Sequence, residues 1–368
     1  MTGPQPNPQI LAITPYVAGE SRVVGANRVV KLSSNEGAFG PPPGAQAAFR
    51  QAAAEMHRYP DGDSRELRRA IGKRFGLDPA RIVCGTGSDE LIQHICHIWG
   101  GPGADILMSM HGFTMYQISG TYSGARVIKV PERNLTADVD ALLAAVTPAT
   151  KILFIANPNN PTGSLLAPAE LARLRAGLPA HVLLVVDAAY AEYVTEPDYD
   201  AGAGLVARTD NTLMLRTFSK IFGMGGMRVG WAYGTREMID LINRVRGVFN
   251  LTIASQAAAV AALAEPGWVE KGVAHNTEWR ARLAAALEKA GIKVWPSHGN
   301  FLLADFATPE RARGADAFLR GRGIIVRPMG GYDLPACLRI TVGTAEECTL
   351  VADALETFMA AEAARADG

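Results

Sequence analysis

The chain has 368 residues, of which 48% are hydrophobic and 20% are charged, as in an ordinary soluble globular protein. Its 36 basic residues balance its 36 acidic residues, and no basic stripe or polybasic amphipathic segment indicates binding to nucleic acid or to a membrane surface. The longest apolar runs are of strand length and are interrupted by Gly, Pro or charge, so the sequence predicts no transmembrane helix.

The N-terminal region predicts an extended arm followed by two helices. Residues 1–9 are rich in Pro, Gln and Asn and lack the positive region and apolar core of a signal peptide, which favours a cytoplasmic protein. An apolar run at residues 28–32 predicts a strand after the arm. Beyond a Pro-rich loop, composition predicts a helix at residues 45–56, and a capping-type serine, Ser64, begins a second helix at residues 64–75.

From residue 81 to residue 233, predicted strands alternate with predicted helices. The strands fall at residues 81–84, 106–108, 126–130, 151–156, 182–186, 212–215 and 229–233. The helices fall at residues 89–99, 113–122, 137–145 and 168–178. Because the strands are nearly continuous in apolar residues, they predict a mostly parallel sheet that helices cover on both faces.

The rest of the chain predicts long helices and then a smaller α+β domain, which makes the fold class α/β. Helices come first, at residues 239–249, 255–264 and 273–290, and the third connects the two domains. The smaller domain is built from strands at residues 293–295, 301–305, 324–326 and 338–342 and from helices at residues 309–320 and 345–364. The predicted division is an N-terminal arm that packs with the small domain (residues 1–44), a large domain (45–272) and a small C-terminal domain (273–368).

The cysteines and histidines indicate neither disulfides nor a metal site. The cysteines are far apart and form no C-x-x-C pair, which predicts reduced core thiols in a cytosolic protein. They are Cys84, Cys96, Cys337 and Cys348. His94 and His97 lie three residues apart on a predicted helix, but that face offers no Asp, Glu or Cys ligand set. Core packing or a helix surface is therefore favoured over a metal site.

One lysine, Lys220, lies in an apolar, glycine-rich stretch directly after the strand predicted at residues 212–215. A desolvated lysine loses part of its preference for the ammonium form and can act as an amine nucleophile that forms a Schiff base with a carbonyl compound. Nearby hydroxyl and guanidinium groups suit a phosphate dianion. They belong to Thr217, Ser219 and Arg228. Together these groups indicate an aldehyde that carries a phosphate, a description that pyridoxal 5'-phosphate (PLP) meets. The alternative is a buried loop whose lysine reaches solvent.

Other polar residues directly follow predicted strands, where ligands bind in open α/β sheets. Asp187 closes an apolar strand, and a carboxylate there needs a positive partner such as a protonated pyridine nitrogen. The alternative for Asp187 is a helix-capping or loop aspartate. Tyr190 and Asn157 are candidates for hydrogen bonds to the phenolic oxygen of the same ring. Their alternatives are a half-buried aromatic and a turn asparagine.

Two further features of the large domain suit the same ligand. The loop after the strand at residues 81–84 consists of small residues and leads into a helix, an arrangement that aims backbone N–H groups at an anion. These residues are Gly85, Thr86, Gly87 and Ser88. Phe113 precedes a predicted helix and either stacks on the pyridine face or packs in the core.

Two C-terminal arginines lie in otherwise apolar strands. Arg339 lies within the strand at residues 338–342, and Arg327 ends the strand at residues 324–326. The planar guanidinium group fits carboxylates and phosphates in two-point contact and stays charged when it is buried. An anion site is therefore favoured for Arg339 over an interdomain salt bridge.

These residues, in this order, resemble the fold-type I PLP enzymes and, within them, the histidinol-phosphate aminotransferase family. The resemblance covers nearly the whole chain. Its most specific motifs are residues 157–163 (NPNNPTG), Ser219-Lys220 followed by Arg228, and residues 338–343 (LRITVG). It implies an aspartate-aminotransferase-like fold and transamination between histidinol phosphate and 2-oxoglutarate, giving imidazole acetol phosphate and glutamate. It also implies a homodimer with shared active sites.

The resemblance implies a role for each cofactor residue by its position. Lys220 forms the Schiff base and shuttles the proton, and Asp187 pairs with the pyridine nitrogen. Asn157 and Tyr190 bond the ring oxygen, and Phe113 takes the stacking position, where the family often has tyrosine. The cofactor phosphate is held by the loop at residues 86–88 and by Thr217, Ser219 and Arg228.

The resemblance also implies partner and substrate contacts. Tyr59 reaches the phosphate of the neighbouring subunit's cofactor. Arg339 binds the anionic group of the substrate, and Tyr16, Asn35 and Arg327 are candidates for the rest of the substrate pocket. Two segments, residues 35–40 (NEGAFG) and 111–113 (HGF), depart from the family pattern near the substrate or cofactor face, which weakens the substrate assignment more than the chemistry.

Three other readings compete with this one. An aminotransferase of the same build that acts on aromatic amino acids is the first alternative, and a PLP decarboxylase or lyase is the second, because fold does not determine reaction. A PLP-binding transcription regulator would need an appended DNA-binding domain. The short segment before the first predicted helix contains no basic helix pair, which disfavours that reading.

Overall fold

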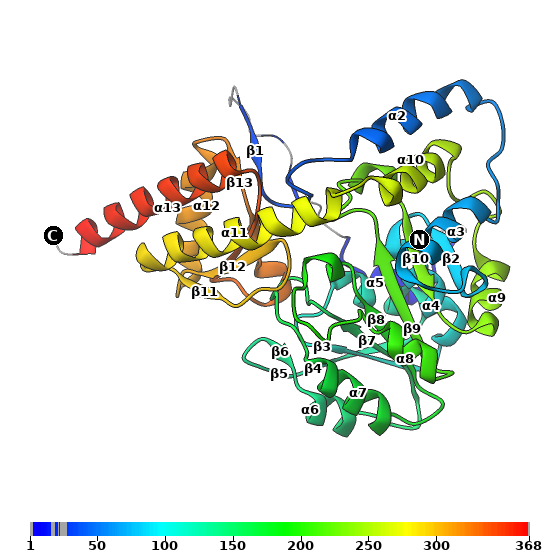
Figure 1. Cartoon of the computed structure of the whole chain (residues 1–368). Coiled ribbons are helices and arrows are strands. Elements are labelled where there is room, and N and C mark those ends of the chain that lie inside the picture. Colours follow the sequence, from blue (N-terminus) through cyan, green and yellow to red (C-terminus); the bar gives the residue numbers. More distant parts are fainter. Residues whose placement is uncertain (1–2, 16–18, 21, 23–27, 367–368) are drawn as a thin grey trace.

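The structure is a computed structural model that describes residues 3–15, 19–20, 22 and 28–366 (Figure 1). The larger sheet has seven strands in the order β2-β10-β9-β8-β7-β3-β4. They are β2 (Ile82–Gly85), β3 (Asp105–Ser109), β4 (Arg126–Val130), β7 (Thr150–Ala156), β8 (Leu183–Asp187), β9 (Thr212–Thr217) and β10 (Gly230–Tyr233). All neighbouring strands run parallel except β10, which is antiparallel to β2 and β9. The structure thus confirms the mostly parallel sheet that the sequence predicts.

Helices cover both faces of this sheet because successive strand residues point to opposite sides. Ile106 and Met108 of β3 pack with α4, α5 and α9, whereas Leu107 between them packs with α6 and α7. Toward β2, the second face is covered by α3 and α10, and α2 packs on α10. These helices are α2 (Pro43–Ala52), α3 (Arg65–Phe75), α4 (Gly87–Trp99), α5 (Thr114–Ser123), α6 (Val139–Ala144), α7 (Pro168–Gly177), α8 (Ala203–Arg208), α9 (Arg236–Val245) and α10 (Ile253–Ala264).

A second, smaller sheet has four antiparallel strands in the order β11-β12-β15-β14. They are β11 (Lys293–Trp295), β12 (Phe301–Asp305), β14 (Arg327–Pro328) and β15 (Cys337–Thr341). Three helices share its core: α11 (Trp268–Lys289), α12 (Pro309–Arg320) and α13 (Ala345–Ala366). The long α11 runs from the larger sheet's helices to the smaller sheet (Figure 1).

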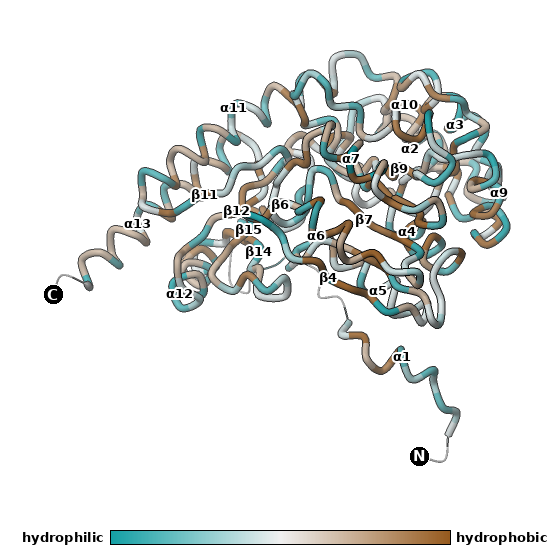
Figure 2. The backbone as a smooth tube through the Cα atoms, turned by 90° about the horizontal axis from the view of Figure 1, so that it is seen from below, coloured by the Kyte–Doolittle hydropathy of each residue, from teal (hydrophilic) through white to brown (hydrophobic). Residues whose placement is uncertain are grey.

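The N-terminal segment meets the smaller sheet's core. β1 (Val30–Lys31) pairs in parallel with β13 (Ile324–Ile325), and Val30 is buried in the core of the smaller sheet. Farther toward the N-terminus, α1 (Pro8–Leu11) projects beyond the body of the molecule (Figure 2). A short hairpin, β5 (Glu132–Arg133) and β6 (Thr136–Ala137), completes the strands. The limits of the three predicted domains stay a prediction.

Hydrophobic residues concentrate in strands of the larger sheet, such as β4 and β7 (Figure 2). Within the residues that the structure describes, no helix is both long enough and apolar enough to cross a membrane. All four cysteines are buried and carry free thiols.

Two differences between the structure and the predicted elements, both at helix ends, have a clear physical cause. The helix predicted at residues 239–249 ends at Val245, because Arg246 turns into an extended conformation and its guanidinium group donates to the carbonyl oxygens of Gly247 and Val248. Ser64 does not cap α3 with its side chain and has a left-handed backbone. The carboxylate of Asp61 accepts from the backbone N–H of Arg65 and satisfies this end of the helix instead.

Candidate active site

A pocket of about 360 Å³ lies at the carboxyl ends of β7, β8 and β9. Residues 33–36 and Arg339 of β15 contribute further walls, so that both sheets border the pocket. It brings together many of the predicted site residues: Asn35, Ser88, Phe113, Asp187, Tyr190, Thr217, Ser219, Lys220, Arg228 and Arg339. This edge of an open α/β sheet is where ligands bind, and the pocket is therefore the candidate active site.

Lys220 follows β9 and lies on the wall of this pocket. Its Nζ atom donates to the carbonyl oxygen of Ser34 at 3.3 Å and lies 5.5 Å from the centre of the Tyr190 ring. Burial, followed by the positive charge of Arg339, lowers the pKa of Lys220 to about 8. Near neutral pH a part of the lysine is therefore the uncharged amine that nucleophilic chemistry requires.

Asp187 ends β8 and is 4% exposed. Its Oδ2 atom accepts a hydrogen bond from the hydroxyl of Tyr116 at 2.7 Å, whereas Oδ1 has no hydrogen-bond partner among the described residues. Burial raises the pKa of Asp187 to about 6. A buried carboxylate oxygen without a partner, on the wall of a pocket, fits a protonated ring nitrogen.

Side chains that can bind an anion also line this pocket. Thr217 donates from Oγ1 to Ser219 Oγ at 2.9 Å, so the two hydroxyls lie side by side. Arg228 donates to Asp89 Oδ2 at 3.0 Å and to the carbonyl oxygen of Gly225. Two hydroxyls and a guanidinium group are suitable partners for a phosphate.

The structure places the predicted anion loop, residues 85–88, against Arg228. Gly87 has a φ of +78°, a backbone conformation that favours glycine, and its Cα side faces a guanidinium nitrogen of Arg228, which would lie 2.2 Å from a Cβ atom placed here. Ser88 lines the pocket at the start of α4. Gly85 lies in β2, and the backbone N–H of Thr86 is already bonded to Glu90 at 2.7 Å.

Of the two residues predicted to bond the ring oxygen, Tyr190 lines the pocket and Asn157 does not. Tyr190 lines the pocket, and its hydroxyl accepts from Asn35 Nδ2 at 2.9 Å. The Asn157 amide is bonded at both ends to the backbone of Leu166, at 3.0 and 2.8 Å, and the pocket lining does not include it. Asn160, which the sequence analysis did not single out, lines the pocket instead. The role of Asn157 stays a prediction.

Arg339 lies in the middle of β15 and is 7% exposed. Its guanidinium group donates to Asn160 Oδ1 and to the carbonyl oxygen of Ser33 at 2.8 Å. A buried arginine on the pocket wall is suited to bind an anionic substrate group.

Three predicted residues lie away from this pocket or outside the described residues. Arg327 faces Arg339 across the strands β14 and β15 but lines a second cavity, of about 670 Å³, together with residues 12–15. Tyr59 is 81% exposed and stacks on Phe249 with ring centres 4.6 Å apart. Tyr16 lies outside the residues that the structure describes.

Phe113 forms part of the pocket wall, and Tyr116 packs behind it. Phe113 lines the pocket, and its ring meets that of Tyr116 edge-on at 5.8 Å. Tyr116 is buried and stacks on Phe154 at 4.5 Å. No role for Tyr116 was predicted from the sequence.

The fold and this pocket define an enzyme with an aspartate-aminotransferase-like fold. The family profile described as aminotransferase class I and II matches residues 27–355, and the chain belongs to this family.

Two relatives with high identity carry the same name. The chain is 60% identical over 367 residues to the histidinol-phosphate aminotransferase of Granulibacter bethesdensis, covering 100% of this chain and 99% of that protein. It is 55% identical over 360 residues to the enzyme of that name from Rhodospirillum centenum, covering 98% and 99% of the two chains.

Solved structures agree with the fold. The structure of histidinol-phosphate aminotransferase from Sinorhizobium meliloti in complex with pyridoxal-5'-phosphate superposes with a TM-score of 0.90 at 27% identity, covering 98% of this chain and 99% of that chain. Aspartate aminotransferase from Thermus thermophilus with maleate gives a TM-score of 0.82 at 22% identity, covering 97% and 100% of the two chains. At that lower identity the likeness concerns the fold alone.

Proposed function

We propose that this enzyme is a PLP-dependent aminotransferase that acts in histidine biosynthesis. It transfers the amino group of histidinol phosphate to 2-oxoglutarate and produces imidazole acetol phosphate and glutamate. The observation that carries the proposal is the pairing, in one pocket, of the Lys220 amine with the unpartnered Oδ1 atom of Asp187. The substrate is proposed from relatives that match over the whole chain at 55–60% identity.

The cofactor's contribution, when it is bound, is a cationic ring that withdraws electrons from the reacting carbon. Asp187 would hold the proton on the pyridine nitrogen, because its unpartnered carboxylate oxygen gains a charge-assisted hydrogen bond there. The amine of Lys220, with its pKa lowered to about 8, would bind the aldehyde and move a proton at Nζ from the substrate carbon.

Other residues of this pocket would orient the cofactor. Ser88, Thr217, Ser219 and Arg228 would hold its phosphate, and Phe113 would pack on its ring. Tyr190 would bond the ring oxygen, and we assign Asn160 to the amide role that the sequence analysis gave to Asn157, because Asn160 reaches the pocket.

The substrate would be held by its negative charge. Arg339 would bind the phosphate of histidinol phosphate and the carboxylate of glutamate in turn, because both fit its two-point geometry. Asn35 borders the same pocket and is bonded to Tyr190 Oη, in the segment after β8, and to Thr341 Oγ1 of β15. Arg327 and Tyr16 stay predicted contacts of the substrate.

The active form is proposed to be a homodimer in which Tyr59 reaches the cofactor phosphate of the other subunit. Tyr59 does not line the active-site pocket of its own subunit. It stacks on Phe249, and Met56 and Val248, close to these two in the sequence, are also exposed apolar residues. Such a group of exposed apolar side chains is typical of a protein contact surface. The cytoplasmic location stays a prediction.

The experiment that tests the substrate is the ratio of kcat/KM for histidinol phosphate to that for phenylalanine and tyrosine, with 2-oxoglutarate as the acceptor. The proposal expects histidinol phosphate to be preferred by at least an order of magnitude, which corresponds to about 1.4 kcal/mol of transition-state binding. Equal or higher values for phenylalanine would instead identify an aminotransferase of aromatic amino acids.

A further inference from the structure

Behind the anion loop, residues 85–88, lies a half-buried carboxylate that no proposed cofactor or substrate contact uses. Glu90 belongs to the first turns of α4, and its side chain is 17% exposed. Its Oε2 atom accepts from the backbone N–H of Thr86 at 2.7 Å and from Asn250 Nδ2 at 2.8 Å. His94, one turn farther along α4, lies 3.7 Å from Oε1.

Glu90 is held in its charged form at this position. Burial by itself raises the pKa of Glu90, but the nearby imidazole of His94 and the hydrogen bonds from Thr86 and Asn250 outweigh burial and lower the pKa to about 2. A permanently ionised carboxylate is a strong acceptor, and hydrogen bonds to charged groups are stronger than those between neutral groups. This bond fixes the orientation of the Thr86 backbone N–H. It therefore also fixes the backbone from which the next residues of the anion loop continue.

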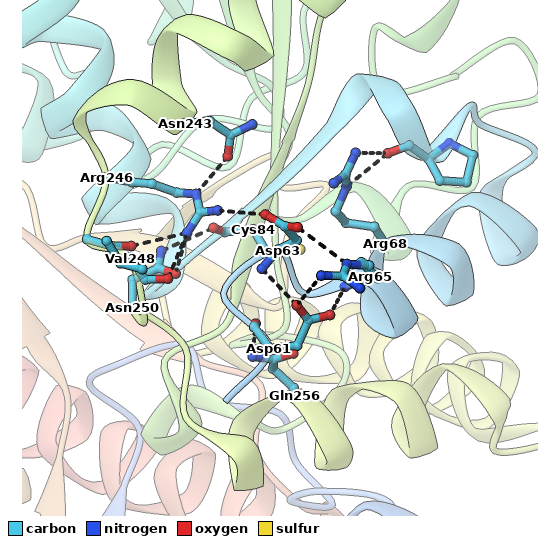
Figure 3. Close-up of polar contacts among 12 residues, drawn as sticks. Asp61, Asp63, Arg65, Arg68, Cys84, Asn243, Arg246, Val248, Asn250 and Gln256 are labelled. Carbon is cyan, nitrogen blue, oxygen red and sulfur yellow. Dashed lines mark hydrogen bonds and ion pairs between the residues drawn. The ribbon is translucent and has the colours of Figure 1, made fainter. Parts of the chain in front are cut away.

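Asn250 joins Glu90 to a second segment of the chain. Besides Glu90, its Nδ2 atom donates to the carbonyl oxygen of Cys84 at 3.2 Å, at the end of β2. Its Oδ1 atom accepts from Arg246 at 3.4 Å. Figure 3 shows the Arg246 guanidinium group at the centre of this segment, bonded to Asn243, Val248 and Asn250 and facing Asp63.

The outer side of the same segment carries Phe249, on which Tyr59 stacks. The turn before α3 approaches it closely, because a Cβ atom on Gly62 would lie 2.6 Å from the carbonyl oxygen of Val248. One unbroken set of contacts therefore leads from Tyr59 through Phe249, Asn250 and Glu90 to Thr86 of the anion loop.

We propose that Glu90 and Asn250 are positioning residues for the anion loop and set its affinity for the phosphate of the cofactor. They act from behind the loop and touch neither cofactor nor substrate. The inference rests on the proposed function, because it takes the anion at this loop to be the phosphate of PLP. If Glu90 only stabilised the start of α4, its loss would weaken all ligands of the pocket alike. If Glu90 acted only through its negative charge, it would repel the phosphate, and its loss would tighten the binding of PLP.

The test compares dissociation constants of the full-length cofactor-free protein for PLP, for pyridoxal, which lacks the phosphate, and for inorganic phosphate. Glu90→Ala and Asn250→Ala are each expected to weaken PLP and inorganic phosphate about tenfold, the effect of losing one hydrogen bond to a charged group. Binding of pyridoxal is expected to stay within about twofold. Glu90→Gln, which keeps one acceptor oxygen, is expected to recover part of the affinity.

A matched control and a repulsive variant sharpen the comparison. Glu237 also lies in the first turn of a helix, α9, and is not in the pocket lining, so Glu237→Ala is expected to leave all three constants unchanged. Asn250→Asp places a second carboxylate beside Glu90 and is expected to weaken PLP more than Asn250→Ala does, with partial recovery as the pH falls.

Three outcomes would overturn the inference. They are unchanged or tighter binding of PLP in Glu90→Ala, an equal loss for pyridoxal and PLP, and an Asn250→Asp variant that binds as well as the unmodified protein. If the unmodified protein binds no PLP at all, the proposed function is wrong. If the unmodified protein binds PLP and the variants give one of the three outcomes above, only the positioning role of Glu90 and Asn250 is wrong.

Discussion

The hydroxyl of Tyr116 donates to Oδ2 of Asp187 at 2.7 Å, although the two residues are 71 positions apart in the chain. This contact takes one oxygen of the carboxylate and leaves the other, Oδ1, without a partner among the described residues. Tyr116 is itself fixed by stacking on Phe154, with the ring planes 5° apart, and it supports Phe113 from the side. The groups proposed for the nitrogen and for the face of the pyridine ring thus share one buried support.

Replacing Tyr116 by phenylalanine removes this hydrogen bond and keeps the ring packing. The bond lowers the pKa of Asp187, so its loss is expected to raise that pKa further and to weaken the hold on a ring proton. We expect kcat to fall about tenfold, from the loss of one hydrogen bond to a charged group. Steady-state rates across a range of pH check this, and an unchanged kcat with an unchanged pH profile would contradict the support role.

The raised pKa of Asp187 also predicts how the stability of the cofactor-free protein depends on pH. The folded value is about 6 and the ordinary value is 3.8, so the unfolded chain releases this proton first as the pH rises. The carboxyl group therefore costs folding free energy increasingly between about pH 4 and pH 6, by at most about 3 kcal/mol above that window.

Asp187→Asn removes this cost and keeps an oxygen that accepts from Tyr116. The cofactor-free variant is expected to unfold at a higher temperature than the unmodified protein at pH 8, with the difference shrinking toward pH 4. Thermal unfolding followed by circular dichroism at both pH values measures this. A difference that is independent of pH, or that grows as the pH falls, would show that Asp187 is not a buried carboxyl of raised pKa.

Alanine substitutions of the two asparagines in the loop after β7, Asn157 and Asn160, are expected to change different properties, namely stability and substrate binding. Asn157→Ala breaks both hydrogen bonds to the Leu166 backbone and is expected to reduce the free energy of unfolding by about 2 kcal/mol. Asn160→Ala removes the acceptor that orients Arg339 and is expected to raise the KM of the amino donor about tenfold. Denaturant titration and steady-state kinetics of both variants separate the roles, and the reverse pattern would return the active-site role to Asn157.

Much of the fold could be predicted from periodicity and apolar runs alone. The strands Arg126–Val130, Lys293–Trp295 and Phe301–Asp305 and the helix Pro309–Arg320 have the bounds that the sequence predicts. Residues 246–249 were wrongly predicted as helix, because Arg246 bonds its own neighbours' carbonyl oxygens and the chain leaves the helix there. A contact between a side chain and the backbone of this kind leaves no periodic signal.

The candidate site was predictable where a residue follows a strand, as Asp187 and Lys220 do, because the topology determines which edge of the sheet they reach. Within a loop that argument fails. Asn157 and Asn160 are both asparagines in the same proline-rich segment, and only the folded loop decides which of them borders the pocket. Tyr116 and Glu90 act through tertiary contacts with residues far along the chain, and the sequence alone does not show such contacts.

The most direct measurement of the central claim is the site at which PLP bonds to the protein. The full-length protein, incubated with PLP and reduced with borohydride, is digested and its peptides are mapped by mass spectrometry. The account predicts a single major adduct, on Nζ of Lys220, that is absent from Lys220→Ala. No adduct, or one that lies mainly on another lysine, would contradict it.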